Sequence, residues 1–144
     1  MKGSYLFYIQ LILVLLLFYL GNFKIILNNI FLSIILLMSA LTIGFTSLNL
    51  GPKSFSPFPT PSKTNELKTN GLFKYSRHPI YAGLIIMGLI LLLSSFRLET
   101  FIVYTSLIVV LNIKADLEEE HLSQKHKDYK FYAQKTRKFF PFLY

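Results

Sequence analysis

The chain has 144 residues, of which 53% are hydrophobic, and a formal net charge of +8 at pH 7. This length allows one domain, and the apolar share is too high for an ordinary soluble core, so part of the surrounding solvent must be lipid. Cysteine is absent, which excludes disulfides, zinc sites built on thiolates and a thiol nucleophile, and we expect no metal site.

Four long stretches contain no Asp, Glu, Lys, Arg or His: residues 4–20, 25–48, 80–96 and 100–113. Such runs are typical of transmembrane helices, because a bilayer core of roughly 30 Å needs about 20 helical residues. No small-x-small cleavage pattern follows the first run, so we interpret it as a retained span. The fourth run is short, and its helix is expected to tilt or to carry Lys114 down to headgroup depth.

The segment between the second and third spans, residues 51–78, is predicted to be a surface linker. Four prolines near its start exclude a helix and a central strand there. The dipeptide Asn70-Gly71 predicts a turn. Pro79 suits the first position of the third helix, which places His78 at the N-cap, where open backbone N–H groups could hold a carboxylate.

Residues 114–144 form a charged tail. Apolar and aromatic residues recur in it at helical spacing up to residue 132, which predicts an amphipathic extension of the fourth helix along the membrane surface. Its basic side chains are interpreted as contacts to anionic headgroups rather than to nucleic acid. These are Lys125, Lys127, Lys130, Lys135, Arg137 and Lys138.

The positions of the basic residues predict the orientation. Thirteen of the fifteen lie at the N-terminus, in the linker or in the tail, and the two short turns hold only Lys24 and Arg97. Lys and Arg resist translocation, so four spans place both termini and the linker in the cytosol. We therefore predict one all-α, multi-pass integral membrane domain over residues 1–144, with about four transmembrane helices and a C-terminal amphipathic helix on the cytosolic face.

Two motifs flank the last pair of predicted spans. The first is Gly71 followed by Arg77-His78-Pro79-x-Tyr81-x-Gly83 at the start of a membrane helix, and the second is Glu118-Glu119-x-x-Leu122, Tyr129-x-x-Tyr132, a basic pair and Pro141. Together they resemble the signature of the isoprenylcysteine carboxyl methyltransferase family, which also includes phospholipid methyltransferases. This resemblance covers residues 65–141 and implies methyl transfer from S-adenosylmethionine.

The resemblance also implies a set of site residues. Carried over by position, the cofactor residues are Asn65, Glu66, Leu67, Lys68, Phe73, His78, Pro79, Ile80, Tyr81 and Glu118. Lys114 takes the place of the basic residue that contacts the substrate, and Lys114 and Glu118 are the expected catalytic pair. A helix N-terminus suits the cofactor carboxylate, and Glu118 can pair with its ammonium or sulfonium charge.

Two positions depart from the family pattern. Phe73 stands where a tyrosine is usual, so a cofactor hydrogen bond is missing or is replaced, with Tyr75 as a candidate. Lys114 stands where an arginine is frequent, and a lysine does not offer a planar two-pronged grip on a carboxylate.

The same residues also allow plainer interpretations. Lys114 and Glu118, four residues apart, could form an ordinary exposed ion pair, and His78 could be only a helix cap. Tyr81 could be a membrane-interface anchor, and for Tyr129 and Tyr132 this is the favoured role. Other polar or small residues inside the apolar runs are expected to serve helix packing through hydrogen bonds or close approach. These are Asn28, Asn29, Asn112, Ala40 and Gly44.

The predicted function is a methyltransferase similar to protein-S-isoprenylcysteine O-methyltransferases, using S-adenosylmethionine. Its acceptor would be an isoprenoid, lipid-like or small hydrophobic molecule at the cytosolic membrane interface, and the sequence does not identify it. One alternative is an NADPH-dependent membrane reductase resembling the sterol reductases. Another is a small transport or assembly protein without catalysis, which the absence of ionisable residues inside the spans disfavours for coupled transport.

Overall fold

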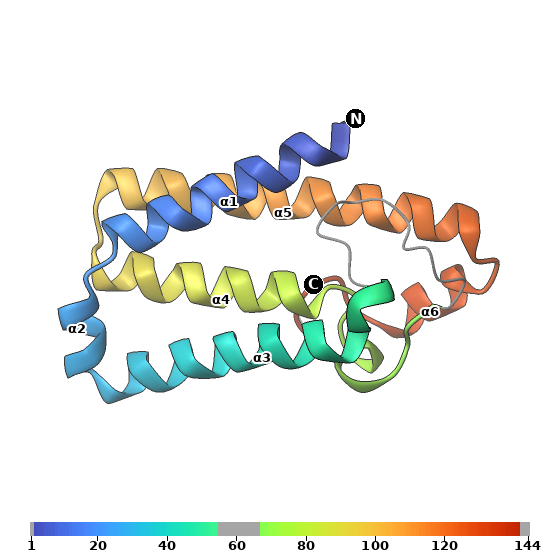
Figure 1. Ribbon diagram of the computed structural model, residues 1–144, viewed down its shortest axis with the longest axis horizontal. Helices are drawn as coiled ribbons and strands as arrows, with labels where there is room; N and C mark the ends of the chain where they lie inside the picture. Colours follow the sequence, from blue (N-terminus) through green and yellow to red (C-terminus); the bar gives the residue numbers. More distant parts are fainter. Residues whose placement is uncertain (1, 55–66, 142–144) are drawn as a thin grey trace.

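The computed structural model describes residues 2–54 and 67–141. All the secondary-structure elements named within these ranges are helices. The elements are α1 (Lys2–Leu20), α2 (Phe23–Asn28), α3 (Ile30–Ser54), the 3₁₀ helix η1 (Gly71–Lys74), α4 (Pro79–Ser94), α5 (Leu98–Lys125) and α6 (Tyr129–Lys135). Figure 1 shows the long helices α1, α3, α4 and α5 running alongside one another. The all-α prediction is confirmed for this part of the chain.

The long helices are apolar over most of their length. In length and composition α3 and α5 are sufficient to cross a membrane, while the apolar parts of α1 and α4 are shorter. Large hydrophobic side chains point outward from α3, among them Phe31, Leu37 and Leu48. Apolar surface of this extent would be costly in water, at about 25 cal/mol per Å², and it fits a lipid environment.

Helix α4 lies at the centre of the bundle, with α3 on one side and α1 and α5 on the other (Figure 1). Two of its glycines permit close contact with its neighbours. A Cβ atom on Gly83 would lie 2.6 Å from the Ile43 side chain of α3, and one on Gly88 would lie 2.9 Å from the Tyr104 ring of α5. These glycines therefore bring three helices together without a gap.

The second predicted span is two helices rather than one. Asn29 ends α2 and its side-chain oxygen accepts hydrogen bonds from the backbone N–H of Phe31 at 3.1 Å and of Leu32 at 3.3 Å. Asparagine favours this capping role because its short side chain competes with the helical backbone bonds. The single helix predicted over residues 25–48 and the bond predicted from Asn29 to another span are therefore wrong.

Helix α3 also runs further than predicted. It continues through Gly51 and Pro52 to Ser54, so the prediction of a non-helical linker is wrong for residues 51–54. Pro52 lacks the N–H that would bond to the carbonyl four residues earlier, but only two residues of the helix follow it, so little helix beyond it is affected. The rest of the proline-rich segment, residues 55–66, lies outside the described residues.

The predictions for the start of α4 and for α5 are largely confirmed. Gly71 has a φ of +64°, as a turn glycine does, and Pro79 follows His78 as the first residue of α4. Helix α5 extends without a break from the apolar region to Lys125. The predicted amphipathic helix does not reach residue 132, because the chain turns after Lys125 and α6 folds back towards the bundle (Figure 1).

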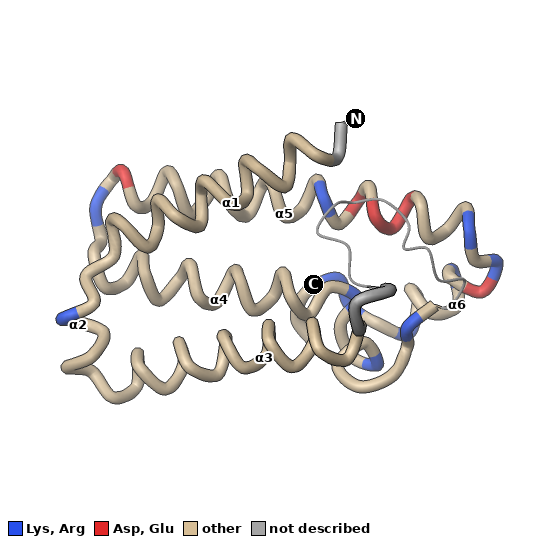
Figure 2. The backbone as a smooth tube through the Cα atoms, in the orientation of Figure 1, with Lys and Arg blue, Asp and Glu red and all other residues tan. Residues whose placement is uncertain are grey.

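Charged residues gather at one end of the bundle. Figure 2 shows most lysines, arginines and acidic residues around the start of α4, the end of α5 and the tail. The opposite end holds Lys24 in α2, Arg97 just before α5 and Glu99 in the first turn of α5.

A small-residue contact was predicted on α3, but Ala40 is exposed and a Cβ atom on Gly44 would meet nothing within 4 Å. That prediction is wrong within the described residues.

Candidate active site

The loop that precedes α4 is held by the C-terminal tail. The backbone N–H of Arg77 donates to the carbonyl of Arg137 at 2.8 Å, and the N–H of His78 donates to the carbonyl of Lys138 at 3.0 Å. A third bond runs from the N–H of Arg137 to the carbonyl of Tyr75 at 3.2 Å. This short parallel bridge fixes the backbone at the start of α4 before any side chain is considered.

The Arg77 side chain joins three elements. Its Nε donates to Glu119 Oε1 of α5 at 2.9 Å, and its Nη1 donates to the carbonyls of Ala133 in α6, at 3.0 Å, and of Thr136, at 2.7 Å. All three acceptors belong to the protein, and the guanidinium is mostly buried. Arg77 therefore organises the site rather than offering its charge to a ligand.

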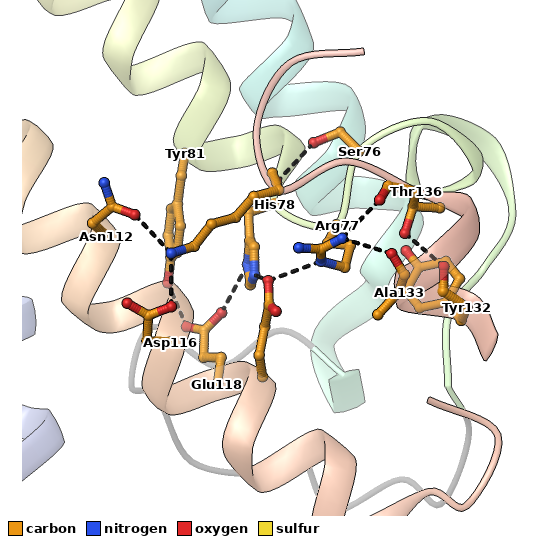
Figure 3. A network of polar contacts seen from close by, with 12 residues as sticks. Ser76, Arg77, His78, Tyr81, Asn112, Asp116, Glu118, Tyr132, Ala133 and Thr136 are labelled. Atoms are coloured by element: carbon orange, nitrogen blue, oxygen red, sulfur yellow. Dashed lines mark hydrogen bonds and ion pairs between the residues drawn. The ribbon is translucent and has the colours of Figure 1, made fainter. Parts of the chain in front are cut away.

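His78 lies between two carboxylates. Its Nδ1 is 3.3 Å from Glu118 Oε2, and its Nε2 is 3.0 Å from Glu119 Oε1 (Figure 3). Burial alone would lower the pKa of His78, but hydrogen bonds to Glu118 and Glu119 and their negative charges outweigh it and raise the pKa. With an acceptor at each ring nitrogen, the imidazolium form, which donates from both, fits this position.

Tyr81 completes the contact with Glu118. The Tyr81 hydroxyl donates to Glu118 Oε1, and the Tyr81 ring stacks on the His78 ring with a centroid separation of 5.4 Å and an interplanar angle of 4°. Pro79 and Ile80 form the first turn of α4 between these two residues. The start of α4 and the charged part of α5 therefore meet at Glu118, as the two motifs together require.

Lys114 lies one turn before Glu118 on α5 and is 2% exposed. Its Nζ donates to Gln10 Oε1 of α1 at 2.6 Å and lies 5.2 Å from the centre of the Tyr81 ring and 5.7 Å from that of Phe7. The interpretation of Lys114 as part of an exposed surface pair is therefore wrong. Lys114 is a buried cation at the boundary between the apolar bundle and the polar site.

A second buried lysine ties the tail to α5. Lys138 Nζ is 2.7 Å from Asp116 Oδ1 and 2.6 Å from Asn112 Oδ1 (Figure 3). The headgroup contact predicted for Lys138 is therefore wrong, and Asn112 bonds to the tail rather than to another span. The other five members of the basic cluster are exposed, as headgroup contact requires. They are Lys125, Lys127, Lys130, Lys135 and Arg137.

The remaining loop residues surround this centre less closely. Leu67, Lys68 and Phe73 are partly buried, and the Phe73 carbonyl accepts a hydrogen bond from the Tyr132 hydroxyl at 2.7 Å. The Tyr75 side chain is exposed, and among the described residues no contact directs it towards Glu118 as a substitute for the missing Phe73 hydroxyl. Asn65 and Glu66 lie outside the described residues.

Tyr129 is 4% exposed, so the prediction that it anchors the membrane interface is wrong. Its hydroxyl is buried and has no hydrogen-bond partner among the described residues. Burial raises the pKa of Tyr129, and the negative charge of Glu119 raises it further, so the hydroxyl stays protonated. An unused buried donor beside an acidic pair is a feature that a polar ligand would satisfy.

Several residues of this network were not predicted as site residues. They are Phe7, Gln10, Asp116 and Glu119. The signal for Gln10 was available, because it is a lone amide in an otherwise apolar run. Glu119 belonged to the motif, but nothing in the sequence told which of two adjacent carboxylates faces His78, and both do.

The apolar bundle and the polar cluster at its end fit the class of small membrane methyltransferases. The family model described as phospholipid methyltransferase matches residues 34–129, two thirds of the chain, including all of α4 and α5. The chain belongs to the phospholipid methyltransferase family. Members of this family are methyltransferases and generally use S-adenosylmethionine. A search of curated proteins found no match, and neither did a search of solved structures.

Proposed function

We propose that this protein transfers a methyl group from S-adenosylmethionine to a lipid-like, isoprenoid or small hydrophobic acceptor at the cytosolic membrane surface. The observation that carries the proposal is the meeting of His78, Tyr81 and Glu118 at the end of an apolar bundle in a chain of this family. A charged, water-soluble donor and a membrane-soluble acceptor need such a boundary to reach each other.

The proposed topology has four spans, formed by α1, α2 with α3, α4, and the apolar part of α5. The charge asymmetry in Figure 2 supports it, because the end with most Lys and Arg residues also holds the site. This end would be cytosolic, together with the N-terminus and the tail. The donor would then enter from the cytosol without crossing the membrane.

The residues around Glu118 fit a donor of this kind. The Glu118 side chain is 24% exposed, so its carboxylate can meet the ammonium or sulfonium charge of a ligand. The N-terminus of α4 offers positive partial charge to the donor's carboxylate, and His78 holds Glu118 in place beside it. The buried Tyr129 hydroxyl could donate a further hydrogen bond to this ligand. Leu67, Lys68 and Phe73 are proposed as further contacts to the methyl donor.

When bound, the donor supplies an electrophilic methyl group on sulfur. The protein then has mainly to align the acceptor's nucleophilic atom with this methyl group and to exclude water, so few catalytic side chains are needed. Tyr81 and Phe139 pack on His78 and shield the centre from solvent. The Lys114 ammonium reaches the Tyr81 ring from the apolar side of the bundle. It can orient an anionic group of the acceptor, because the point charge of a lysine suits phosphate as well as carboxylate.

The proposal can be tested with membranes that contain the protein. They would be incubated with S-adenosylmethionine labelled in the methyl group, and the lipid fractions would then be separated and counted. We expect one fraction to carry label, and we expect Glu118→Gln membranes to give much less. Equal label in both, or label that excess S-adenosylhomocysteine does not suppress, would rule the proposal out.

A further inference from the structure

The two adjacent glutamates of α5 meet the same histidine at different ring nitrogens. Glu118 Oε2 lies 3.3 Å from His78 Nδ1, and Glu119 Oε1 lies 3.0 Å from His78 Nε2. Glu119 Oε1 also accepts a hydrogen bond of 2.9 Å from Arg77 Nε. Figure 3 shows the His78 ring between Glu118 and the Arg77 side chain. The contacts therefore form one chain, from Arg77 through Glu119 and His78 to Glu118.

The charge of Glu119 is used inside the protein. Burial alone would raise the pKa of Glu119, but hydrogen bonds from His78 and Arg77 and their positive charges outweigh it and lower the pKa. Glu118 has other surroundings, because it accepts a hydrogen bond from the neutral Tyr81 hydroxyl and interacts electrostatically with Lys114. The two glutamates are therefore not equivalent, although they are neighbours in the sequence.

A neutral imidazole at His78 could not donate to both glutamates. It carries one N–H, so its other ring nitrogen would turn a lone pair towards a carboxylate. The imidazolium donates from both nitrogens, but His78 is 6% exposed, and burial disfavours the charged form. The second carboxylate offsets this cost. Glu119 therefore allows His78 to stay charged and to donate to Glu118 at the same time.

The C-terminal tail packs on the same ring through uncharged groups. The Phe139 ring lies 6.1 Å from the His78 ring, and the carbonyl of Lys138 accepts the His78 backbone N–H, while the Lys138 ammonium bonds to Asp116. Two of the groups that face His78 are acids, and their charges favour the imidazolium. The charged or titratable groups around the ring are Arg77 in the loop, Tyr81 on α4, and Glu118 and Glu119 on α5.

We propose that Glu119 is a positioning residue for the methyl donor, because it keeps His78 bonded to Glu118 and so lets Glu118 present its carboxylate to the donor's positive charge. This inference rests on the proposed function. Glu119 acts through His78 and has no need to touch the donor, since its Oε1 already accepts from Arg77 and His78. The two glutamates then have separate tasks, one towards the ligand and one towards the histidine.

Glu119→Gln separates this role from a merely structural one. The glutamine keeps the size of the side chain and an oxygen that Arg77 can use, but it removes the negative charge beside His78. The pKa of His78 should then fall, so that its bond to Glu118 is lost as the pH rises. A structural role alone predicts a lower Tm with an unchanged pH dependence of donor binding. Glu120→Gln is the matched control, because it removes the same charge from an exposed position next in the chain.

The experiment measures calorimetric binding of S-adenosylhomocysteine, which keeps the donor's ammonium group, between about pH 5.5 and about pH 8.5, on either side of the ordinary histidine pKa of about 6.5. At the acidic end Glu119→Gln should bind within about twofold of wild type, and at the alkaline end about tenfold more weakly, as loss of one hydrogen bond between charged groups would. The ammonium of the ligand titrates in both experiments, so the ratio of the two affinities reports on the protein. Glu120→Gln should match wild type throughout.

A double-mutant cycle shows whether Glu119 acts through the histidine. In a His78→Gln background, Glu119→Gln should change the affinity by the same small factor at every pH, because no imidazole remains to titrate. A pH profile of Glu119→Gln parallel to that of the wild type would overturn the inference and leave the methyltransferase in place. A loss of equal size at both ends of the pH range would do the same, since it would mean that Glu119 supports the fold or contacts the donor itself.

A measurement on the wild-type protein keeps the inference testable even if the variant does not fold. The chain has three histidines, so nuclear magnetic resonance of isotope-labelled histidine, with His78→Gln to assign the signal, reports the protonation of His78 without any ligand. Both ring nitrogens should carry protons at the alkaline end of the range, and a neutral ring there would overturn the inference. A wild-type protein that binds no S-adenosylhomocysteine at any pH would instead overturn the proposed function and this inference with it.

Discussion

The two ends of the bundle solve the same packing problem with different chemistry. At the end opposite the site, the turn between α1 and α2 meets the end of α4 through neutral groups, with the Asn22 N–H donating to Ser94 Oγ at 3.0 Å. A hollow of about 410 Å³ there is bordered by Tyr19, Asn22, Ser95 and Arg97, among others. At the site end, the contacts run between charged groups, with His78 between Glu118 and Glu119.

This difference separates what the fold requires from what function adds. A neutral contact suffices to join the helices at this end, as the bond from Asn22 to Ser94 shows. Buried charges are costly to desolvate, and replacing them with apolar groups is often neutral or stabilising. The site end nevertheless carries a buried imidazole, two glutamates and two lysines. We interpret that concentration as the demand of a charged ligand, and the comparison predicts that substitutions at the two ends have different consequences.

The largest effect is expected at Glu118. Glu118→Gln should weaken binding of S-adenosylhomocysteine by about 10- to 100-fold, the range expected for one hydrogen bond to a charged group. The amide can still bond to Tyr81 and His78, so the fold should persist. Calorimetry on detergent-solubilised protein measures the affinity of the wild type and of the variant for S-adenosylhomocysteine. Glu120→Gln, at an exposed position on the same helix, is the control and should bind as the wild type does.

The next effect is expected at Lys114. Lys114→Met should reduce methyl transfer about tenfold or more, as loss of one charged contact to the acceptor would. Binding of S-adenosylhomocysteine should stay nearly intact. Steady-state kinetics on the labelled lipid fraction measures the loss of methyl transfer, and calorimetry measures the binding of S-adenosylhomocysteine. Full activity in this variant would show that the buried ammonium has no part in acceptor recognition.

A smaller effect is expected from pH, through His78. Its folded-state pKa is raised above the ordinary value of 6.5, so its protonation stabilises the folded protein below that value, and the stabilisation is lost as the pH rises through the folded-state pKa. The groups facing the ring are Glu118 and Glu119 on α5 and Tyr81 on α4. The Tm should therefore fall on the alkaline side, and His78→Gln should flatten this fall. Parallel Tm profiles for both proteins would contradict the assignment.

The smallest effect is expected at the opposite end. Ser94→Ala removes the acceptor for the Asn22 N–H and should lower stability by about 1 kcal/mol. Methyl transfer should be unchanged, since nothing at this end is assigned to the reaction. Tm and activity measurements on the same preparation check both statements. A large loss of transfer without loss of stability would mean that the far end takes part in function.

Much of this arrangement could be predicted from the sequence. Uncharged runs predicted the long helices, and Pro79 predicted the start of α4. The break at Asn29 was not predicted, because a capping asparagine and a buried asparagine look alike in a hydrophobic run. Pro52 was expected to exclude a helix, but it lies only two residues before the end of α3. The sequence does not fix where that helix ends.

The candidate site was predicted in part. The contact between His78 and Glu118 followed from two motifs on either side of one helical hairpin. The partners of Lys114 and Lys138 were not predictable, because Gln10 and Asp116 are brought to them only by tertiary packing. The role of Tyr129 was mistaken for the same reason, since a tyrosine near a membrane surface can face lipid or protein.

Ultraviolet cross-linking of labelled S-adenosylmethionine tests the central claim most directly. The claim is that the loop before α4 and the charged part of α5 enclose one donor molecule. After irradiation, digestion and mass spectrometry, label should appear on peptides from both residues 67–81 and residues 114–119, and excess S-adenosylhomocysteine should suppress it. Label confined to the opposite end of the bundle, or label that the excess ligand leaves unchanged, would contradict the claim.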